Sequence, residues 1–393
     1  MTDSADARRS ARAGTSTDDV RRRNLSTVLT LVHHHRSLSR AELTRRTGLS
    51  RSTTKDLVGE LAARGLVHES PALGVSQVGR PSPIVSPGNR VLAVAITPEV
   101  DAVTVGVVGL GGLVLDEIRL PTDGVPTATE TVAVATQAIE GIRQGLTDRQ
   151  SITAVGVAVP GLVHGPGSAV QLAPNLDWHD EEIGQMLSAA TGLPVYAGND
   201  ANTGAVAEHL FGRHGNADHL IYVNGGPSGI GAGFVVAGEL LGGVAGYAGE
   251  LGHTYVGGRE LCHCGSVGCL ETEVTQAPLS RLLEELDSRP ADSPPVPHSG
   301  AELDVINRQA RSLGIALGNA VNMLNPTLIV LGGFLRVFPA YAADVLRDEL
   351  AYRSLRAPRD LVRVVAARLG SDTLMIGAAE LAFAPLLADP GEY

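Results

Sequence analysis

Apolar residues near the start of the chain recur at roughly helical spacing. A helix over residues 18–35 is predicted by the repeat of Val20, Leu25, Val28, Leu29, Leu31 and Val32. Ser39 followed by Glu42 has the spacing of a capping box, which predicts a short second helix ending near Thr47-Gly48. The first 48 residues therefore predict one long helix and one short helix.

A third helix is predicted directly after the second. Ser50 is a suitable N-cap, Gly65 is a suitable C-terminal stop, and the buried face would carry Leu57, Val58 and Leu61. Two short helices joined by a Gly-containing turn form a helix-turn-helix unit. Its second helix normally enters the DNA major groove by its N-terminal turns, which here present Arg51, Ser52, Thr53, Thr54 and Lys55.

The segment after this unit fits a β-hairpin wing over residues 68–88. Its Gly79-Arg80-Pro81 tip suits insertion of Arg80 into a minor groove, whose negative potential attracts arginine. Residues 18–88 are therefore predicted to form a winged helix-turn-helix DNA-binding domain. The alternative is a small helical bundle that contacts other proteins. One such unit per chain predicts a homodimer, because two half-sites are usually needed for affinity.

The remainder of the chain alternates strand-like and helix-like patterns. Pro- and Ser-rich residues 81–89 are predicted to form a linker. Buried strands are expected at 91–98, 103–110 and 152–161, then at 219–224, 233–238 and 327–333, with helices near 128–147 and 180–191. These two sets predict an α/β architecture of two lobes, with a ligand cleft between them.

Composition and charge restrict the class of protein. The 393 residues suffice for two or three domains. The chain contains no run of 18 apolar residues and no apolar signal-peptide core, so we expect a cytoplasmic protein without a membrane partner. Residues 1–17 are rich in Ser, Ala, Arg and Thr and are predicted to be a disordered tail.

The net charge of −11 is distributed unevenly. Residues 1–90 contain 15 Arg and Lys residues against 8 Asp and Glu residues, so the acidity lies in the rest of the chain. A basic arm on an acidic body is typical of a DNA-binding domain attached to a sensor or enzyme. A solvated basic tail is the alternative.

All three cysteines lie within eight positions. Cys262, Cys264 and Cys269 follow His253, and Gly257, Gly258, Gly265 and Gly268 supply sharp turns. Three thiolates and one imidazole fill the tetrahedral shell of a structural Zn²⁺. The odd number of cysteines argues against a disulfide framework. The sequence therefore predicts a zinc loop over residues 253–269, with His263 as a competing ligand that we expect to point away.

The Glu250–Glu271 segment resembles the E-x-G-H and C-x-C-G-x-x-G-C-x-E signatures of the ROK family, which comprises repressors, open reading frames and sugar kinases. The resemblance extends from about residue 20 to the C-terminus and is greatest for winged-helix regulators of the family. It implies that residues 91–393 form an effector domain with the two-lobed, actin-like (ribonuclease-H-like) fold.

The same resemblance implies a sugar site in the cleft. The matching positions are Asn175, Asn199, Asp200, Glu250, His253 and Glu271. Carboxylates and amides suit vicinal hydroxyls, which both donate and accept hydrogen bonds. Each position has a simpler alternative: Asn199-Asp200 as a helix cap, Glu250 as a solvated charge, and Asn175 as a turn residue. Zinc would hold the loop that carries His253 and Glu271.

The family's first phosphate loop, D-x-G-G-T, is replaced here by Ala95-Ile96-Thr97-Pro98-Glu99. The resemblance gives Asp200 the place of the family's general base, but a domain without this loop is predicted to be inactive as a kinase. We therefore predict a sugar-responsive transcriptional repressor that binds operator DNA as a homodimer or tetramer, with structural Zn²⁺. The alternatives are an active sugar kinase with a DNA-binding arm and a regulator controlled by a protein partner.

Overall fold

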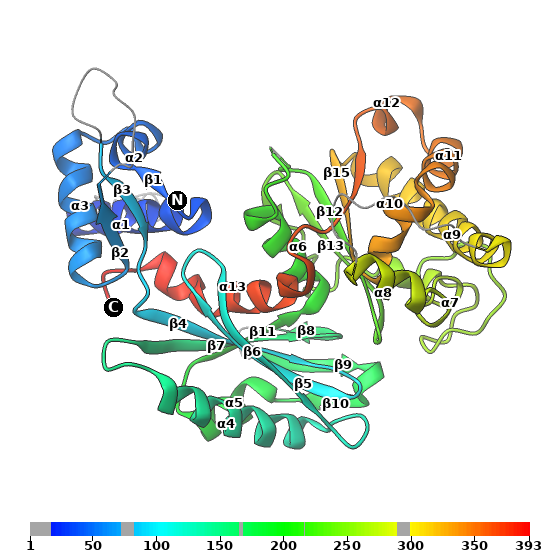
Figure 1. Ribbon diagram of the computed structural model, residues 1–393, viewed down its shortest axis with the longest axis horizontal. Coiled ribbons are helices and arrows are strands. Elements are labelled where there is room, and N and C mark those ends of the chain that lie inside the picture. The colour runs from blue at the N-terminus through cyan, green and yellow to red at the C-terminus, as the bar shows by residue number, and fades with distance from the viewer. Residues whose placement is uncertain (1–16, 72–81, 165–167, 216, 289–298) are drawn as a thin grey trace, which may run out of the picture. The chain divides into compact units, whose positions relative to one another are not determined.

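The computed structural model describes residues 17–71, 82–164, 168–215, 217–288 and 299–393. These residues fall into two compact units (Figure 1). The first unit takes in the described residues up to Val91, together with Gly109–Gly111 and Phe383–Tyr393. The second unit comprises Leu92–Val108 and Gly112–Ala382.

The first unit has the helix and strand order of a winged helix-turn-helix domain. Its elements are α1 (Thr17–His35), β1 (Leu38–Ser39), α2 (Arg40–Thr47), α3 (Arg51–Ala63), β2 (Val67–Ser70) and β3 (Ile84–Pro87). The strands form one sheet in the order β1-β3-β2. The three predicted helices are confirmed. The predicted linker at 81–89 is wrong for residues 84–87, because these form β3, which pairs with both neighbouring strands.

Capping explains where α2 and α3 begin. The Ser39 hydroxyl accepts a hydrogen bond from the Glu42 backbone N–H (3.1 Å), and Ser50 does the same for Thr53 (3.1 Å). The Glu42 carboxylate does not return to Ser39, since it pairs with Arg45 and Arg46. The predicted capping box is thus only half formed.

The end of the chain belongs to the first unit. Arg64 donates a hydrogen bond to the Gly391 carbonyl (2.9 Å), and the Phe383 ring lies 5.6 Å from the ring of His33. The Gly111 backbone N–H donates to His33 Nδ1 (2.8 Å). The sequence-based prediction had placed Gly109–Gly111 and Phe383–Tyr393 in the effector domain, residues 91–393.

The second unit contains two α/β lobes, each built on a five-stranded sheet. In the first lobe the strand order is β11-β7-β4-β5-β6, with α4 and α5 packed together and a small hairpin sheet β10-β9-β8 (Figure 1). The bounds are β4 (Val91–Pro98), β5 (Ala102–Gly109), β6 (Leu113–Pro121), α4 (Ala128–Gly145), β7 (Ser151–Val159), β8 (Leu162–His164), β9 (Ala169–Ala173), β10 (Trp178–Glu181), α5 (Ile183–Thr191) and β11 (Val195–Asn199).

The second lobe has the strand order β14-β13-β12-β15-β16. Long helix α9 contributes most of its apolar face to the core of this lobe, where it packs on α11. The elements are α6 (Asp200–Phe211), β12 (Leu220–Gly226), β13 (Gly229–Val236), β14 (Glu239–Leu240), α7 (Leu270–Glu273), α8 (Ser280–Ser288), α9 (Gly300–Leu324), β15 (Leu328–Gly333), α10 (Val337–Tyr341), α11 (Ala343–Arg353), α12 (Arg356–Arg359) and β16 (Arg363–Ala366). Helix α13 (Thr373–Ala388) follows β16 and contacts both lobes.

Helix α13 packs against the backbone of its neighbours in the second unit. A Cβ on Gly156 of β7 would lie 1.7 Å from the Ala378 carbonyl oxygen, and a Cβ on Gly377 would lie 2.4 Å from the Thr203 carbonyl oxygen of α6. Residues Gly370–Ala388 are long and apolar enough to cross a membrane, but 56% of that window is buried. Because core helices pass the same test, we interpret α13 as a core helix.

Candidate functional site

The second unit contains a cavity of about 920 Å³ lined by residues of both lobes. This size is within the usual range for small-molecule sites. The cavity brings together all six side chains predicted to contact a sugar: Asn175, Asn199, Asp200, Glu250, His253 and Glu271. They come from the turn before β10, the start of α6, the 3₁₀ turn at residues 250–253 and α7.

Asn199 and Asp200 begin α6. The Asn199 side chain accepts a hydrogen bond from the Asn202 backbone N–H (2.9 Å) and donates one to the Gly161 carbonyl (3.1 Å). Asn199 is therefore the N-cap of α6, which agrees with the alternative prediction that Asn199-Asp200 caps a helix. Burial raises the pKa of Asp200 to about 6, although hydrogen bonds from the Ala201 backbone and Asn224 favour its charged form.

Asn175, Gly229 and Glu271 meet at one end of the cavity. Asn175 Nδ2 donates to the Ser228 carbonyl (2.6 Å), which joins the first lobe to the second. Gly229 has φ +101°, and a Cβ at this position would lie 2.5 Å from Glu271 Oε2. The positive φ favours glycine here, and the missing side chain leaves room for the Glu271 carboxylate in its present position.

Glu250 and His253 lie at either end of one short 3₁₀ turn. Glu250 Oε2 is 3.9 Å from His253 Nε2, and the Glu250 side chain is half-exposed. Partial burial raises the pKa of Glu250, while the nearby His253 acts in the opposite direction. Glu250 is therefore an acidic group available to a ligand.

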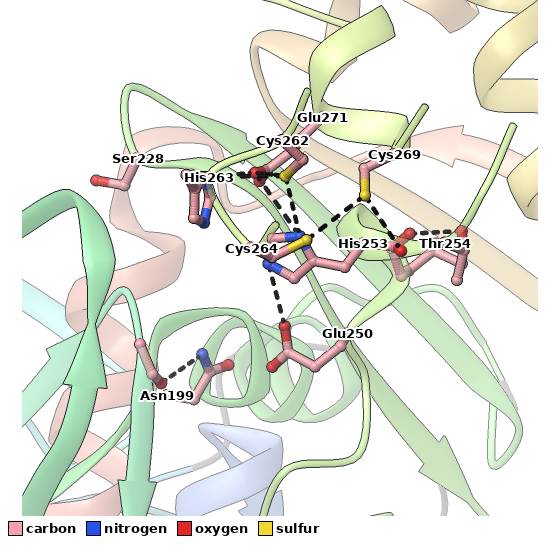
Figure 2. Close-up of polar contacts among 12 residues, drawn as sticks. Asn199, Ser228, Glu250, His253, Thr254, Cys262, His263, Cys264, Cys269 and Glu271 are labelled. Carbon is pink, nitrogen blue, oxygen red and sulfur yellow. Dashed lines mark hydrogen bonds and ion pairs between the residues drawn. The ribbon is translucent and has the colours of Figure 1, made fainter. Parts of the chain in front are cut away.

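The three cysteines and His253 form one group, as Figure 2 shows. Their ligand atoms all lie within 4.8 Å of one another. Cys262 Sγ is 3.6 Å from His253 Nδ1, and Cys264 Sγ is 3.7 Å from Cys269 Sγ. Three sulfur atoms and one imidazole are the donor set that zinc prefers in structural sites, so these residues fit the ion.

The protonation of the thiols is mixed. A hydrogen bond from the Ser266 backbone lowers the pKa of Cys264 to about 7. Burial raises the pKa of Cys262 to about 12, and it also raises the pKa of Cys269. A bound cation removes the proton from a coordinating thiol outright.

His263 does not point away, contrary to the sequence-based expectation. Its Nδ1 lies 2.9 Å from Glu271 Oε1, and its ring packs edge-on against His253 with centroids 5.1 Å apart (Figure 2). A second group of possible ligands therefore exists: His253, Cys262, His263 and Glu271. The spacing of the motif could not place His263, because loop direction depends on the fold around it.

The segment 95–99 forms the end of β4 and the turn after it. Thr97, Pro98 and Glu99 line the cavity. The Glu99 carboxylate accepts hydrogen bonds from the Thr104 hydroxyl (2.6 Å) and from Arg119 (3.0 and 3.1 Å). Its charge is thus compensated within the first lobe.

The predicted DNA-contacting residues of α3 are not all exposed. Arg51, Ser52 and Lys55 are exposed and Thr53 is half-buried. Thr54 is fully buried, and its hydroxyl donates to the Ser50 carbonyl (3.0 Å) and accepts from Thr44 (3.1 Å). The assignment of Thr54 to DNA contact is therefore wrong, because it faces α2. Arg80 lies outside the described residues.

Sequence reasoning missed several residues that line the cavity, among them Asp177, His179, Tyr247 and Arg336. None of these has a motif around it. Tyr247 donates a hydrogen bond to Gln171 of the hairpin sheet, and this pairing joins segments 76 positions apart. Only the tertiary structure brings such residues to one site.

The fold and the site define a helix-turn-helix protein with a two-lobed, sugar-kinase-like domain. Residues 24–71 match the IclR helix-turn-helix domain, and residues 94–384 match the ROK family. The chain belongs to the ROK family. The actin-like fold expected from the resemblance is confirmed.

Three relatives illustrate the similarity. A putative xylose repressor from Caldicellulosiruptor sp. (strain Rt8B.4) is 29% identical over 94% of this chain and 98% of its own length. A glucokinase from Streptomyces coelicolor is 31% identical over 72% of this chain and 95% of its own length. The crystal structure of a ROK family transcriptional regulator, a homolog of the E. coli MLC protein, has a TM-score of 0.73 and 25% identity, and covers 94% of this chain and 97% of its own. The putative repressor and the transcriptional regulator thus also cover the first unit, because each matches 94% of this chain, whereas the glucokinase matches 72%.

Proposed function

We propose that this protein is a sugar-responsive transcriptional repressor. The observation that carries the proposal is the combination, in one chain, of a helix-turn-helix unit with exposed Arg51 and Lys55 and a cavity lined by carboxylates suited to hydroxyl groups. Relatives that match along nearly the full chain are described as xylose repressors, which favours a pentose or hexose as effector.

The charge of the cavity favours an uncharged sugar over a sugar phosphate. Five carboxylates line it: Asp177, Asp200, Glu250 and Glu271, together with Glu99, whose charge is compensated by Arg119. Arg336 also lines the cavity, but it is paired with Asp287 (2.9 Å) and donates to the Gly333 carbonyl (3.0 Å). A phosphate group would meet net negative potential here, which costs binding energy.

The direct test starts by selecting, from fragmented genomic DNA, the sites that the immobilised full-length protein retains. We expect one enriched site, whose affinity falls about tenfold or more in the presence of D-xylose or D-glucose, in the usual range of coupling between sites. The 5-phosphate of xylose and the 6-phosphate of glucose are expected to have no effect. Fluorescence anisotropy measures each affinity.

Glu250→Gln is the matched variant for this test. It should bind the enriched site normally and lose the sugar response, because Glu250 lies far along the chain from the helix-turn-helix unit and lines the cavity. A protein that retains no DNA, or one that responds only to the phosphates, would refute the proposal.

We further propose that the Cys-His group holds one structural Zn²⁺ through His253, Cys262, Cys264 and Cys269. Four protein ligands leave no open position for a substrate, so the ion would hold the loop between Glu250 and Glu271 and supply no reaction step.

One helix-turn-helix unit per chain favours a homodimer or tetramer on DNA in the cytoplasm.

The effector domain is proposed to lack kinase activity. Pro98 has no backbone N–H to offer a phosphate, and the segment Ala95–Glu99 contains no glycine to let a phosphate approach the backbone. We expect ATP consumption to stay at background with D-glucose and D-xylose in a coupled assay.

The similarity to glucokinases makes an active sugar kinase the second candidate. ATP turnover that disappears in Asp200→Asn would establish that candidate instead.

A further inference from the structure

His263 contacts Glu271, a carboxylate that lies between the Cys-His group and the cavity. Its Nδ1 is 2.9 Å from Glu271 Oε1, and both residues line the cavity. The Glu271 side chain is only 9% exposed, while that of His263 is 37% exposed. Figure 2 shows the His263 ring beside the Glu271 carboxylate. Because an ionised carboxylate only accepts hydrogen bonds, His263 is the donor in this pair.

The two oxygens of Glu271 face different surroundings. Oε1 lies toward the Cys-His group, 3.2 Å from Cys262 Sγ and 3.7 Å from His253 Nδ1. Oε2 lies over Gly229, where a Cβ would be 2.5 Å away, and Asn175 Nδ2 is 4.0 Å from that same Cβ position. Oε2 is therefore the oxygen placed to accept a hydroxyl hydrogen bond at the end of the cavity that carries Asn175.

Geometry makes His263 the main partner of this oxygen. His263 Nδ1 lies nearer to Glu271 Oε1 (2.9 Å) than Cys262 Sγ (3.2 Å) or His253 Nδ1 (3.7 Å) does. An imidazole N–H is also a stronger donor than a thiol S–H, so the hydrogen bond from His263 fixes the direction of the carboxylate. Without this donor the carboxylate is expected to turn from its present direction.

We propose that His263 is a positioning residue for the effector, which holds Glu271 so that its Oε2 accepts a hydroxyl of the sugar, and that His263 is not a metal ligand. The inference rests on the proposed sugar response. It assigns the two overlapping groups of possible ligands to separate tasks: the three cysteines with His253 bind the metal, and Glu271, held by His263, binds the sugar.

The test compares the full-length protein with His263→Leu, His263→Asn, Glu271→Gln and the double variant His263→Leu/Glu271→Gln. Zinc per chain is measured by elemental analysis, and the absorption of the Co²⁺-substituted protein reports its thiolate ligands. Binding of D-xylose and D-glucose is measured by calorimetry. Asn is the conservative replacement, because its amide N–H can reach the position of the histidine donor.

We expect every variant to keep one zinc and an unchanged Co²⁺ spectrum. His263→Leu should weaken sugar binding about tenfold or more, the usual effect of losing a hydrogen bond to a charged group. His263→Asn should recover most of that loss. In the Glu271→Gln background, removing His263 should change affinity less than about twofold, because the two residues act as a unit.

Four results would overturn the inference. Loss of zinc in His263→Leu would make His263 a ligand. Unchanged sugar affinity in that variant, or an equal loss in the Glu271→Gln background, would show that His263 does not act through Glu271. Failure of the wild type to bind either sugar would refute the proposed effector class and this inference together, so the two failures are distinguishable.

Discussion

Cys264→Ser is expected to lose the metal, to lower the melting temperature of the protein by about 10 °C or more, and to abolish the sugar response. Cys264 is exposed, so the loss of packing by this substitution is small. The loop 253–269 is held by two isolated β-bridges, Tyr255 with Cys269 and Leu261 with Val267. A metal ion that joins its ends would therefore contribute a large part of its stability.

The measurement is differential scanning calorimetry of the full-length protein before and after dialysis against a chelator. Leu261→Ala is the matched control in the same loop, since Leu261 is 73% exposed and has no ligand atom. The control should keep its zinc and its sugar response. Equal melting temperatures for wild type and Cys264→Ser, with the response retained, would refute a structural metal.

The double substitution Arg51→Ala/Lys55→Ala is expected to weaken binding to the enriched DNA site about 100-fold, since each base or phosphate contact contributes roughly 1–3 kcal/mol. Both residues are exposed on the first turns of α3, next to the N-cap Ser50. The same variant should keep its sugar affinity, because neither residue lines the cavity.

Anisotropy titrations at several salt concentrations measure this effect. The slope of affinity against salt should fall by about one for each phosphate contact removed. Arg347→Ala/Arg356→Ala removes the same charge from exposed positions of the second unit and should bind DNA within about twofold of wild type. An equal loss in both variants would mean that net charge, and not α3, sets the affinity.

The sequence predicted the fold well where the signal was local. The apolar repeat of α1, the N-caps Ser39 and Ser50, and the buried runs of β4, β5 and β7 all lie close to their predicted positions. Each of these features depends on a few neighbouring residues, so chain order is enough to find it. The ligand groups of the Cys-His loop were predictable for the same reason, as they lie within one short segment.

Predictions that depended on orientation were less successful. Thr54 was assigned to DNA contact by its place on α3, but its side chain faces Thr44 of α2 and is buried. His263 was expected to point away and instead contacts Glu271. Helix periodicity states which residues share a face, but the packing of neighbouring elements decides which face is covered.

The sequence by itself determined the class of the protein: a helix-turn-helix unit, a two-lobed α/β domain and a Cys-His loop, because each is encoded in local patterns. Only the tertiary structure decided how the residues of the site are arranged. It placed Gly229 beneath the Glu271 carboxylate, brought Asn175 across to Ser228, and grouped Phe383–Tyr393 with the first unit. These contacts join segments that lie far apart in the chain, and only the packing of both sheets brings them together.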